Sequence, residues 1–183
     1  NSVLEQNGMK GDIGLLSIDI DGNDYHVWQS IDVINPAIVV IEYNAVFGDL
    51  HSVTIPYRPD FFRTKAHFSN LYFGASLQAL ILLGKEKGYT FVGTNTIGAN
   101  AFFIRDDLAP KITSLLDSIS AYPSIFREAR SHTGKLLLLG GLKRSEIIKN
   151  SPLIDLKNKK NTSLYSLGEI YSSSWRNGKK NIL

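Results

Sequence analysis

Two short apolar runs separated by a helical pattern constrain the fold of this chain more than any other feature of its sequence. Residues 14–20 and 37–43 are rich in β-branched side chains and lack a clean apolar–polar alternation, which is typical of strands covered on both faces. Between them, Asn23 is placed to cap a helix, apolar side chains recur at helical spacing, and Pro36 is expected to follow the end of that helix. A strand, a helix and a second strand within about thirty residues predict a right-handed βαβ unit with parallel strands.

The middle of the chain predicts the rest of the sheet. After the second run comes a long, aromatic-rich connection over residues 45–73, and then a helix over 75–87 that ends at a glycine. Residues 89–95 and 99–105 have the composition of strands, and the short turn between them requires an antiparallel hairpin. We therefore expect an α/β fold whose sheet is mostly parallel and ends in an antiparallel hairpin.

The last third of the chain differs in composition from the rest. Helical patterns are expected over 111–120 and 124–131, followed by a glycine pair and a polar tail. From residue 151 onward there are six Lys and Arg residues against two Asp and Glu, which is more typical of a solvated end than of a nucleic-acid site. The sequence thus predicts a first region over 1–108 and a helical appendage with a basic polar tail over 109–183.

The composition excludes several classes of site. The chain has no cysteine, which removes disulfides, thiolate zinc sites and thiol nucleophiles together. With 43% hydrophobic and 20% charged residues it has the make-up of an ordinary soluble globular domain, and no apolar run approaches the length needed to cross a bilayer. We expect a cytoplasmic protein with no membrane partner and no specific nucleic-acid partner.

Polar side chains gather where the two proposed parallel strands end. In an open parallel sheet, ligands bind beyond the carboxyl ends of the strands, and carboxylates buried there are costly unless cations, metals or ligand hydroxyls pair with them. We therefore expect a site at this edge, in which Asp19 and Glu42 from neighbouring strands approach each other. A simple turn with a helix cap is an equally good interpretation of residues 21–24. The polar residues concerned are Asp19, Asp21, Asn23 and Asp24 after the first strand, and Glu42, Tyr43 and Asn44 after the second.

Short motif matches give two further interpretations of the residues after the first strand. The run from Asp19 begins like a calcium-binding EF-hand loop, but Asp24 and Ser30 stand where that loop needs glycine and glutamate, so we reject this interpretation. Asp19-Ile20-Asp21 also resembles the manganese-binding Asp-x-Asp motif of nucleotide-sugar glycosyltransferases. A metal-dependent glycosyltransferase is therefore an alternative function.

A longer, ordered set of motifs lies within residues 1–108. It consists of Leu15-Leu-Ser-Ile-Asp-Ile-Asp-Gly-Asn-Asp-Tyr-His-Val-Trp, Val39-Val-Ile-Glu-Tyr-Asn-Ala-Val-Phe-Gly, Tyr72-Phe-Gly-Ala-Ser-Leu and Asn100-Ala-Phe-Phe-Ile-Arg-Asp-Asp. Together these segments resemble FkbM-like S-adenosylmethionine-dependent methyltransferases. The resemblance implies the C-terminal half of a Rossmann-like sheet with strand order 3-2-1-4-5-7-6. In that order 14–20 is the fourth strand, 37–43 the fifth, 89–95 the sixth and 99–105 the antiparallel seventh.

The resemblance also implies a cofactor and roles for individual residues. S-adenosylmethionine would be the methyl donor, with Asp19 and Ile20 in contact with this cofactor and Asp19 or Asp21 nearest the methyl group. Glu42 and Asn44 would orient the acceptor of an O-methyl transfer, either a small molecule or a saccharide. Alternatively, Asp19, Asp21 and Glu42 would surround a Mg²⁺ ion that lowers the pKa of the acceptor hydroxyl. The glycine-rich cofactor turn of the family is expected upstream of this chain.

Other residues complete the expected site. His51 follows the second strand by a few residues and is a candidate general base near neutral pH. Asn23, Tyr43, Asn44 and Tyr72 are candidates for binding the substrate. A non-catalytic α/β binding module remains a further alternative to an enzyme. If the strand at 14–20 has no inner neighbour, its unpaired apolar edge favours self-association.

Overall fold

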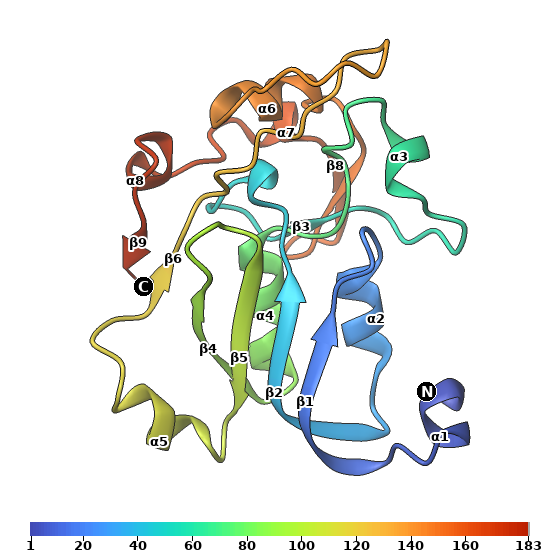
Figure 1. Ribbon diagram of the computed structural model, residues 1–183, viewed down its shortest axis with the longest axis vertical. Coiled ribbons are helices and arrows are strands. Elements are labelled where there is room, and N and C mark those ends of the chain that lie inside the picture. The colour runs from blue at the N-terminus through green and yellow to red at the C-terminus, as the bar shows by residue number, and fades with distance from the viewer. Residues whose placement is uncertain (183) are drawn as a thin grey trace.

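The computed structural model describes residues 1–182, which form a four-stranded sheet capped by smaller elements (Figure 1). The sheet contains β1 (Gly11–Ile18), β2 (Ile34–Glu42), β5 (Asn100–Arg105) and β4 (Tyr89–Thr94), in the order β1-β2-β5-β4. β1 and β2 are parallel neighbours, and β4 and β5 form an antiparallel hairpin in the same sheet, as the sequence predicted. β5 also pairs antiparallel with β2, so three of the four strands run in one direction although only the β1–β2 pairing is parallel. The α/β class is confirmed.

The boundary expected at Pro36 is wrong. Helix α2 (Asp24–Ser30) ends earlier, and β2 begins at Ile34, so Pro36 lies inside the strand opposite Ile13 of β1. The pairing of β2 with β5 starts only at Ile38. Because Pro36 lies where β2 has a neighbour on one side alone, its missing N–H breaks no ladder on the other side.

Two helices cover one face of the sheet. α2 and α4 (Leu77–Glu86) lie on the face turned away from the viewer in Figure 1. The Trp28 ring of α2 packs against Tyr89 and Phe103 with ring centroids 5.9 and 4.9 Å apart, and Ser76 caps α4 by accepting a hydrogen bond from the Ala79 N–H. On the opposite face no described helix crosses the sheet, and the Leu15 side chain of β1 is 55% exposed.

The long connection after β2 forms a second layer above the carboxyl ends of the strands. It contains the 3₁₀-helix η1 (Ala45–Phe47), β3 (Val53–Thr54) and α3 (Arg63–Ala66). β3 pairs with β7 (Leu153–Asp155), which in turn pairs with β8 (Lys160–Thr162). The C-terminal segment therefore folds back over the edge of the sheet at which β1 and β2 end (Figure 1).

Residues after 108 carry more structure than the expected appendage and tail. The helix predicted over 111–120 is the short α5 (Ala109–Thr113). The helix predicted over 124–131 is wrong, because Pro123 precedes an extended segment. There the Arg130 N–H donates to Ser69 O and not to a carbonyl of a preceding helical turn. Buried side chains lie throughout the C-terminal part, among them Ile148, Leu153, Tyr171 and Trp175. The division of the chain at residue 108 stays a prediction. The remaining described elements are α1 (Ser2–Gln6), β6 (Ser120–Ala121), α6 (Leu142–Ile147), α7 (Leu164–Leu167), α8 (Ser173–Arg176) and β9 (Asn181–Ile182).

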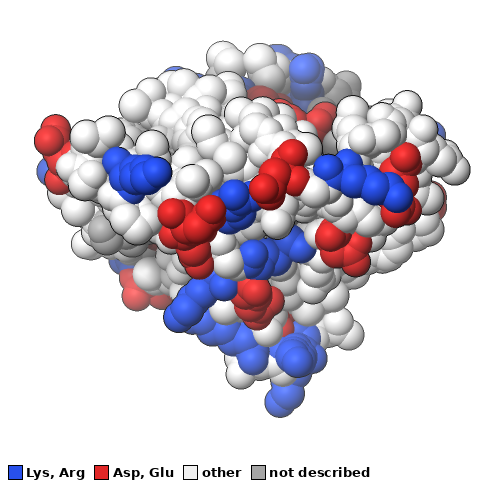
Figure 2. Space-filling view, turned by 90° about the horizontal axis from the view of Figure 1, so that it is seen from below, with Lys and Arg blue, Asp and Glu red and all other residues white. Residues whose placement is uncertain are grey.

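Two surface properties bear on partners. Over the described residues, no helix has both the length and the apolar character needed to cross a membrane. The face seen from below shows acidic and basic side chains mixed together (Figure 2). Arg105, for example, forms ion pairs with Asp12 at 2.8 Å and with Asp107 at 2.7 Å.

Candidate functional site

The turn after β1 is held by a buried carboxylate. The Asp24 side chain is fully buried and accepts hydrogen bonds from the backbone N–H of Ile20 at 2.9 Å and of Gly22 at 2.8 Å. Burial raises the pKa of Asp24 above its ordinary value. Asp21 adopts a left-handed backbone conformation (φ 56°), and both Asp19 and Asp21 remain exposed at the end of the strand. Asp24 therefore fixes the turn, and Asp19 remains exposed to a ligand.

Glu42 is the most perturbed carboxyl group of this edge. The register pairs Ile18 with Ile41, so Asp19 and Glu42 follow at the same level of neighbouring strands. Burial raises the pKa of Glu42 to about 8, with further increases from the charges of Asp19 and Asp24. Its Oε2 atom is buried and has no hydrogen-bond partner among the described residues. A carboxyl group that holds its proton near neutral pH is suited to proton transfer, or to a site that gains a cation.

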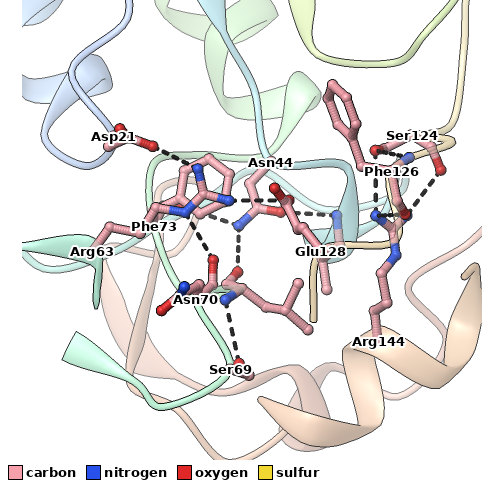
Figure 3. Close-up of polar contacts among 12 residues, drawn as sticks. Asp21, Asn44, Arg63, Ser69, Asn70, Phe73, Ser124, Phe126, Glu128 and Arg144 are labelled. Atoms are coloured by element: carbon pink, nitrogen blue, oxygen red, sulfur yellow. Dashed lines mark hydrogen bonds and ion pairs between the residues drawn. The ribbon is translucent and has the colours of Figure 1, made fainter. Parts of the chain in front are cut away.

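Arg63 links the edge of the sheet to the C-terminal half of the chain (Figure 3). Its Nη1 lies 2.5 Å from Asp21 Oδ1, and its Nη2 lies 3.0 Å from Glu128 Oε1. Its Nε donates to Asn70 O at 2.8 Å, and its guanidinium carbon lies 3.8 Å from the centre of the Phe73 ring. Each of the three guanidinium nitrogens thereby makes one of these contacts, so Arg63 positions two carboxylates at once.

Two cavities meet at Glu128. The larger has a volume of about 380 Å³, and its lining includes Ile20, Asp21, Phe61, Phe62, Arg63, Asn70 and Glu128. The smaller has a volume of about 30 Å³, and its lining includes Glu42, Asn44, Ser124, Glu128 and Arg144. Apolar rings and carboxylates thus stand side by side in the larger cavity, while the smaller one contains the perturbed Glu42.

Arg144 is a buried cation that comes from α6. It is 2% exposed, and it donates to Ser124 O at 2.9 Å, to Ser124 Oγ at 3.3 Å and to Phe126 O at 3.0 Å (Figure 3). Its Nε has no partner among the described residues, and burial lowers the pKa of Arg144. Glu42 and Arg144, each with one unpartnered buried polar atom, thus both line the small cavity. A volume of about 30 Å³ has room for a water molecule.

Most of the expected substrate-binding side chains have structural roles. Asn44 donates to Leu71 O and Phe73 O and accepts from the Val46 N–H. The hydroxyl groups of the two tyrosines donate to backbone carbonyls, Tyr43 to Tyr122 O and Tyr72 to Pro152 O. Asn23 makes no side-chain cap of α2, contrary to expectation: its amide nitrogen donates to Arg58 O, while Asp24 accepts from the N–H groups of the turn before the helix.

His51 lies away from the carboxylate cluster. Its Nε2 forms a hydrogen bond of 2.8 Å with Glu169 O, and it lines neither of the two cavities. The structure instead brings in Arg63, Glu128 and Arg144, which the sequence analysis did not select. These residues come from segments far apart in the chain and belong to no short motif, so their proximity is visible only after folding.

The metal site expected from Asp19, Asp21 and Glu42 is not assembled. Within residues 1–182, no group of three or more His, Asp or Glu side chains is arranged to hold a metal ion. The physical reason is the ion pair between Asp21 and Arg63, which places a fixed positive charge where a cation would have to bind. The Mg²⁺ site therefore stays a prediction that this arrangement does not support, and we derive no chemistry from it.

Comparison with known proteins leaves the geometry of the site as the basis for a function. No family model, no curated protein and no solved structure matches this chain. The features to be explained are the carboxylates at the ends of two parallel strands, the raised pKa of Glu42 and the adjoining cavity that carries aromatic rings.

Proposed function

We propose that this chain is the C-terminal half of a Rossmann-like, S-adenosylmethionine-dependent methyltransferase domain of the FkbM-like kind. The observation that carries the proposal is the unpartnered, proton-holding Glu42 beside Asp19 at the carboxyl ends of β1 and β2. The order β1-β2-β5-β4 supports it, since it corresponds to the last four places of the order 3-2-1-4-5-7-6. Ligands of open α/β sheets bind at this edge.

The charge of the cluster suits the donor. S-adenosylmethionine supplies, when bound, a methyl group on a positively charged sulfonium. The pKa of Glu42 is raised in part because Asp19 and Asp24 repel a further negative charge, and a cation at this position would relieve that repulsion. Ile20, which is 53% exposed beside Asp19, offers an apolar contact for the methyl group. The residues present thus fit the sulfonium end of the donor.

The larger cavity suits the acceptor. Asp21 and Glu128 present carboxylate oxygens whose positions are fixed by Arg63, and the Phe61 and Phe62 rings form an apolar wall. The acceptor is a small molecule or a saccharide whose hydroxyl group is oriented by these carboxylates. Glu42 lines the adjoining smaller cavity, and in its deprotonated form it accepts the hydroxyl proton through an intervening water as methyl transfer proceeds.

Two alternative functions differ in what they require of this site. A metal-dependent glycosyltransferase needs a metal held by Asp19 and Asp21, and the ion pair of Asp21 with Arg63 argues against it. A non-catalytic binding module predicts the same fold without affinity for the donor. Binding of S-adenosylmethionine therefore separates the proposal from that module.

Calorimetry with the charged donor and its neutral product tests the proposal. At about pH 9, where Glu42 is mostly ionised, we expect the protein, expressed with its natural N-terminus, to bind S-adenosylmethionine. Glu42→Gln and Asp19→Asn should each weaken that binding by about tenfold, the scale of one lost charge contact. Binding of S-adenosylhomocysteine, which lacks the sulfonium charge, should change little. Asp60→Asn, which removes an exposed carboxylate outside the cluster, is the matched control. Absence of binding by the wild-type protein would contradict the proposal.

A further inference from the structure

The segment predicted as a helix over 124–131 is one arm of a projecting hairpin. Residues 125–130 run antiparallel to residues 136–142, with the Leu137 N–H donating to Ala129 O at 2.8 Å and a bridge between Arg130 and Leu136. The turn at 131–135 is closed by the Ser131 N–H donating to Lys135 O at 2.9 Å. We call residues 125–142 the 125–142 hairpin. It extends beyond the rest of the molecule at the top of Figure 1.

This hairpin exposes an unusual amount of apolar surface. Three consecutive leucines are exposed, by 41% at Leu136, 37% at Leu137 and 60% at Leu138. Ile125 is 66% exposed on the opposite arm, and Phe126 and Leu142 lie nearby with 41% and 43% exposed. Leu136 and Leu137 are successive residues of the extended arm and point to opposite sides, so they present apolar surface on both sides of it, and Leu138 follows in a left-handed conformation (φ 52°). A groove on a protein partner covers one side, whereas a fluid apolar phase surrounds both.

Basic side chains border the apolar surface. Between residues 125 and 143, four Lys and Arg residues are exposed, at Arg127, Arg130, Lys135 and Lys143, and the one acidic residue is Glu128. Glu128 is already paired with Arg63. The exposed surface of the hairpin therefore combines apolar tips with net positive charge, which complements an anionic lipid headgroup layer.

The hairpin is anchored to the body of the protein at its base and turn. His132 stacks on Phe68 with ring centroids 3.6 Å apart, and the Arg130 N–H donates to Ser69 O at 3.1 Å. Arg144 binds the backbone of the first arm at Ser124 and Phe126. These contacts leave the leucines outside, so the exposed apolar surface is a property of the folded chain and not of a loose loop.

We propose that the 125–142 hairpin docks the protein on a membrane surface that contains anionic lipids, with Leu136, Leu137 and Leu138 inserted at the headgroup boundary. This inference revises the expectation of no membrane partner, which considered only membrane-spanning runs. It does not rest on the methyltransferase proposal. Glu128 and Arg130 also line the larger cavity, so docking would bring the mouth of that cavity to the membrane surface.

Vesicle co-sedimentation tests the docking surface. We expect the protein to bind vesicles of phosphatidylcholine and phosphatidylglycerol in equal parts, and to bind phosphatidylcholine alone at least tenfold more weakly, since each basic residue near an anionic surface contributes about fivefold. The double variant Leu136→Ser/Leu138→Ser should lose at least tenfold in binding, because apolar side chains no longer insert. Lys135→Gln/Lys143→Gln should also weaken binding. Tyr165→Ser, which removes a side chain 72% exposed elsewhere, should bind like the wild type.

Fluorescence gives a second measurement that does not depend on the amount bound. The native Trp28 and Trp175 are buried, at 1% and 4% exposed, so a Leu136→Trp variant adds one exposed indole. We expect its emission to shift to shorter wavelength with the anionic vesicles and to remain unshifted with phosphatidylcholine alone. Three outcomes overturn the proposal: no binding to either vesicle, binding that the leucine variants leave unchanged, or a dimer in solution that the same leucine variants dissociate.

Discussion

Asp21 and Arg63, 42 positions apart in the sequence, are joined by an ion pair of 2.5 Å, and both residues line the larger cavity beside the turn after β1. The same guanidinium holds Glu128 on the other side. One cation thus fixes two carboxylates, one from the turn after β1 and one from the 125–142 hairpin. It also explains why the aspartates after β1 do not form a metal site.

Replacing this cation should destabilise the fold as well as the site. Arg63→Gln leaves Asp21 and Glu128 facing each other without compensation and removes the contact with the Phe73 ring. We expect a loss of about 2 kcal/mol in the free energy of unfolding, since the pair is only partly exposed. Chemical denaturation measures it. Arg58→Gln breaks the fully exposed pair with Asp60 and should leave the denaturation midpoint unchanged; equal stability of both variants would refute the central position of Arg63.

Gly22 is required by the close approach of Phe61. A Cβ atom at residue 22 would lie 2.3 Å from the Phe61 ring, whereas one at Gly14 in β1 would meet nothing within 4 Å. Gly22→Ala should cost about 1–3 kcal/mol in the free energy of unfolding through overpacking, and displace the ring that walls the larger cavity. Gly14→Ala should stay within about 0.5 kcal/mol of the wild type. Thermal melting of the two variants side by side distinguishes them, and equal melting temperatures would show that the turn adapts freely.

The sequence predicted the sheet well because its signals are local. The apolar runs that became β1 and β2 are short, and the helix between them repeats at helical spacing, so the parallel pair followed from connection length alone. The turn before Asn100 required the antiparallel hairpin of β4 and β5 in the same way. The arm at 125–130 was mistaken for a helix because its extended form depends on contacts with Ser69 and Leu137, which sequence spacing does not contain.

The candidate site was predicted only in part, for a similar reason. Asp19, Asp21 and Glu42 were identified because the carboxyl ends of parallel strands share one edge of the sheet. That arrangement does not depend on the conformation of the loops. Arg63, Glu128 and Arg144 come from loops and a short helix whose positions are fixed by tertiary packing. Tyr43 and Asn44 were expected to face a substrate, but a polar side chain just past a strand end also has to satisfy nearby backbone groups, and here it does so.

Glu42 should make stability depend on pH. Folding raises the pKa of Glu42 from 4.5 to about 8, so between these values the folded chain keeps a proton that the unfolded chain releases. Its contribution to the free energy of unfolding therefore falls as pH rises through this window, by up to about 1.4 kcal/mol per pH unit. Glu42→Gln removes this dependence, and we expect the variant to gain stability relative to the wild type as pH rises from 5 to 8, with no gain below about 4.5. Denaturation across this range measures the difference, and a constant difference would contradict the raised pKa.

The edge of β1 should promote self-association. β1 pairs with β2 alone among the described strands, and Leu15 is 55% exposed on the uncovered face. We expect sedimentation of this chain to show concentration-dependent association. Leu15→Lys should shift it toward the monomer, because edge lysines oppose strand pairing, while Leu115→Lys, at a side chain 78% exposed outside the sheet, should not. A monomer at all concentrations would show that the edge is protected in solution.

Transfer of labelled methyl groups from S-adenosylmethionine into a cell extract, by wild-type protein and by Glu42→Gln, tests the central claim most directly. We expect incorporation by the wild type to rise with pH, to reach half its maximum near pH 8, where Glu42 is half deprotonated in the unliganded protein, and to level off about one pH unit higher. Glu42→Gln should fold, but its rate of methyl incorporation should be at least about a hundredfold lower than that of the wild type, as expected for loss of a positioned base. The rate of this variant should also lack the rise with pH. Equal incorporation by wild type and Glu42→Gln across the pH range would contradict the account.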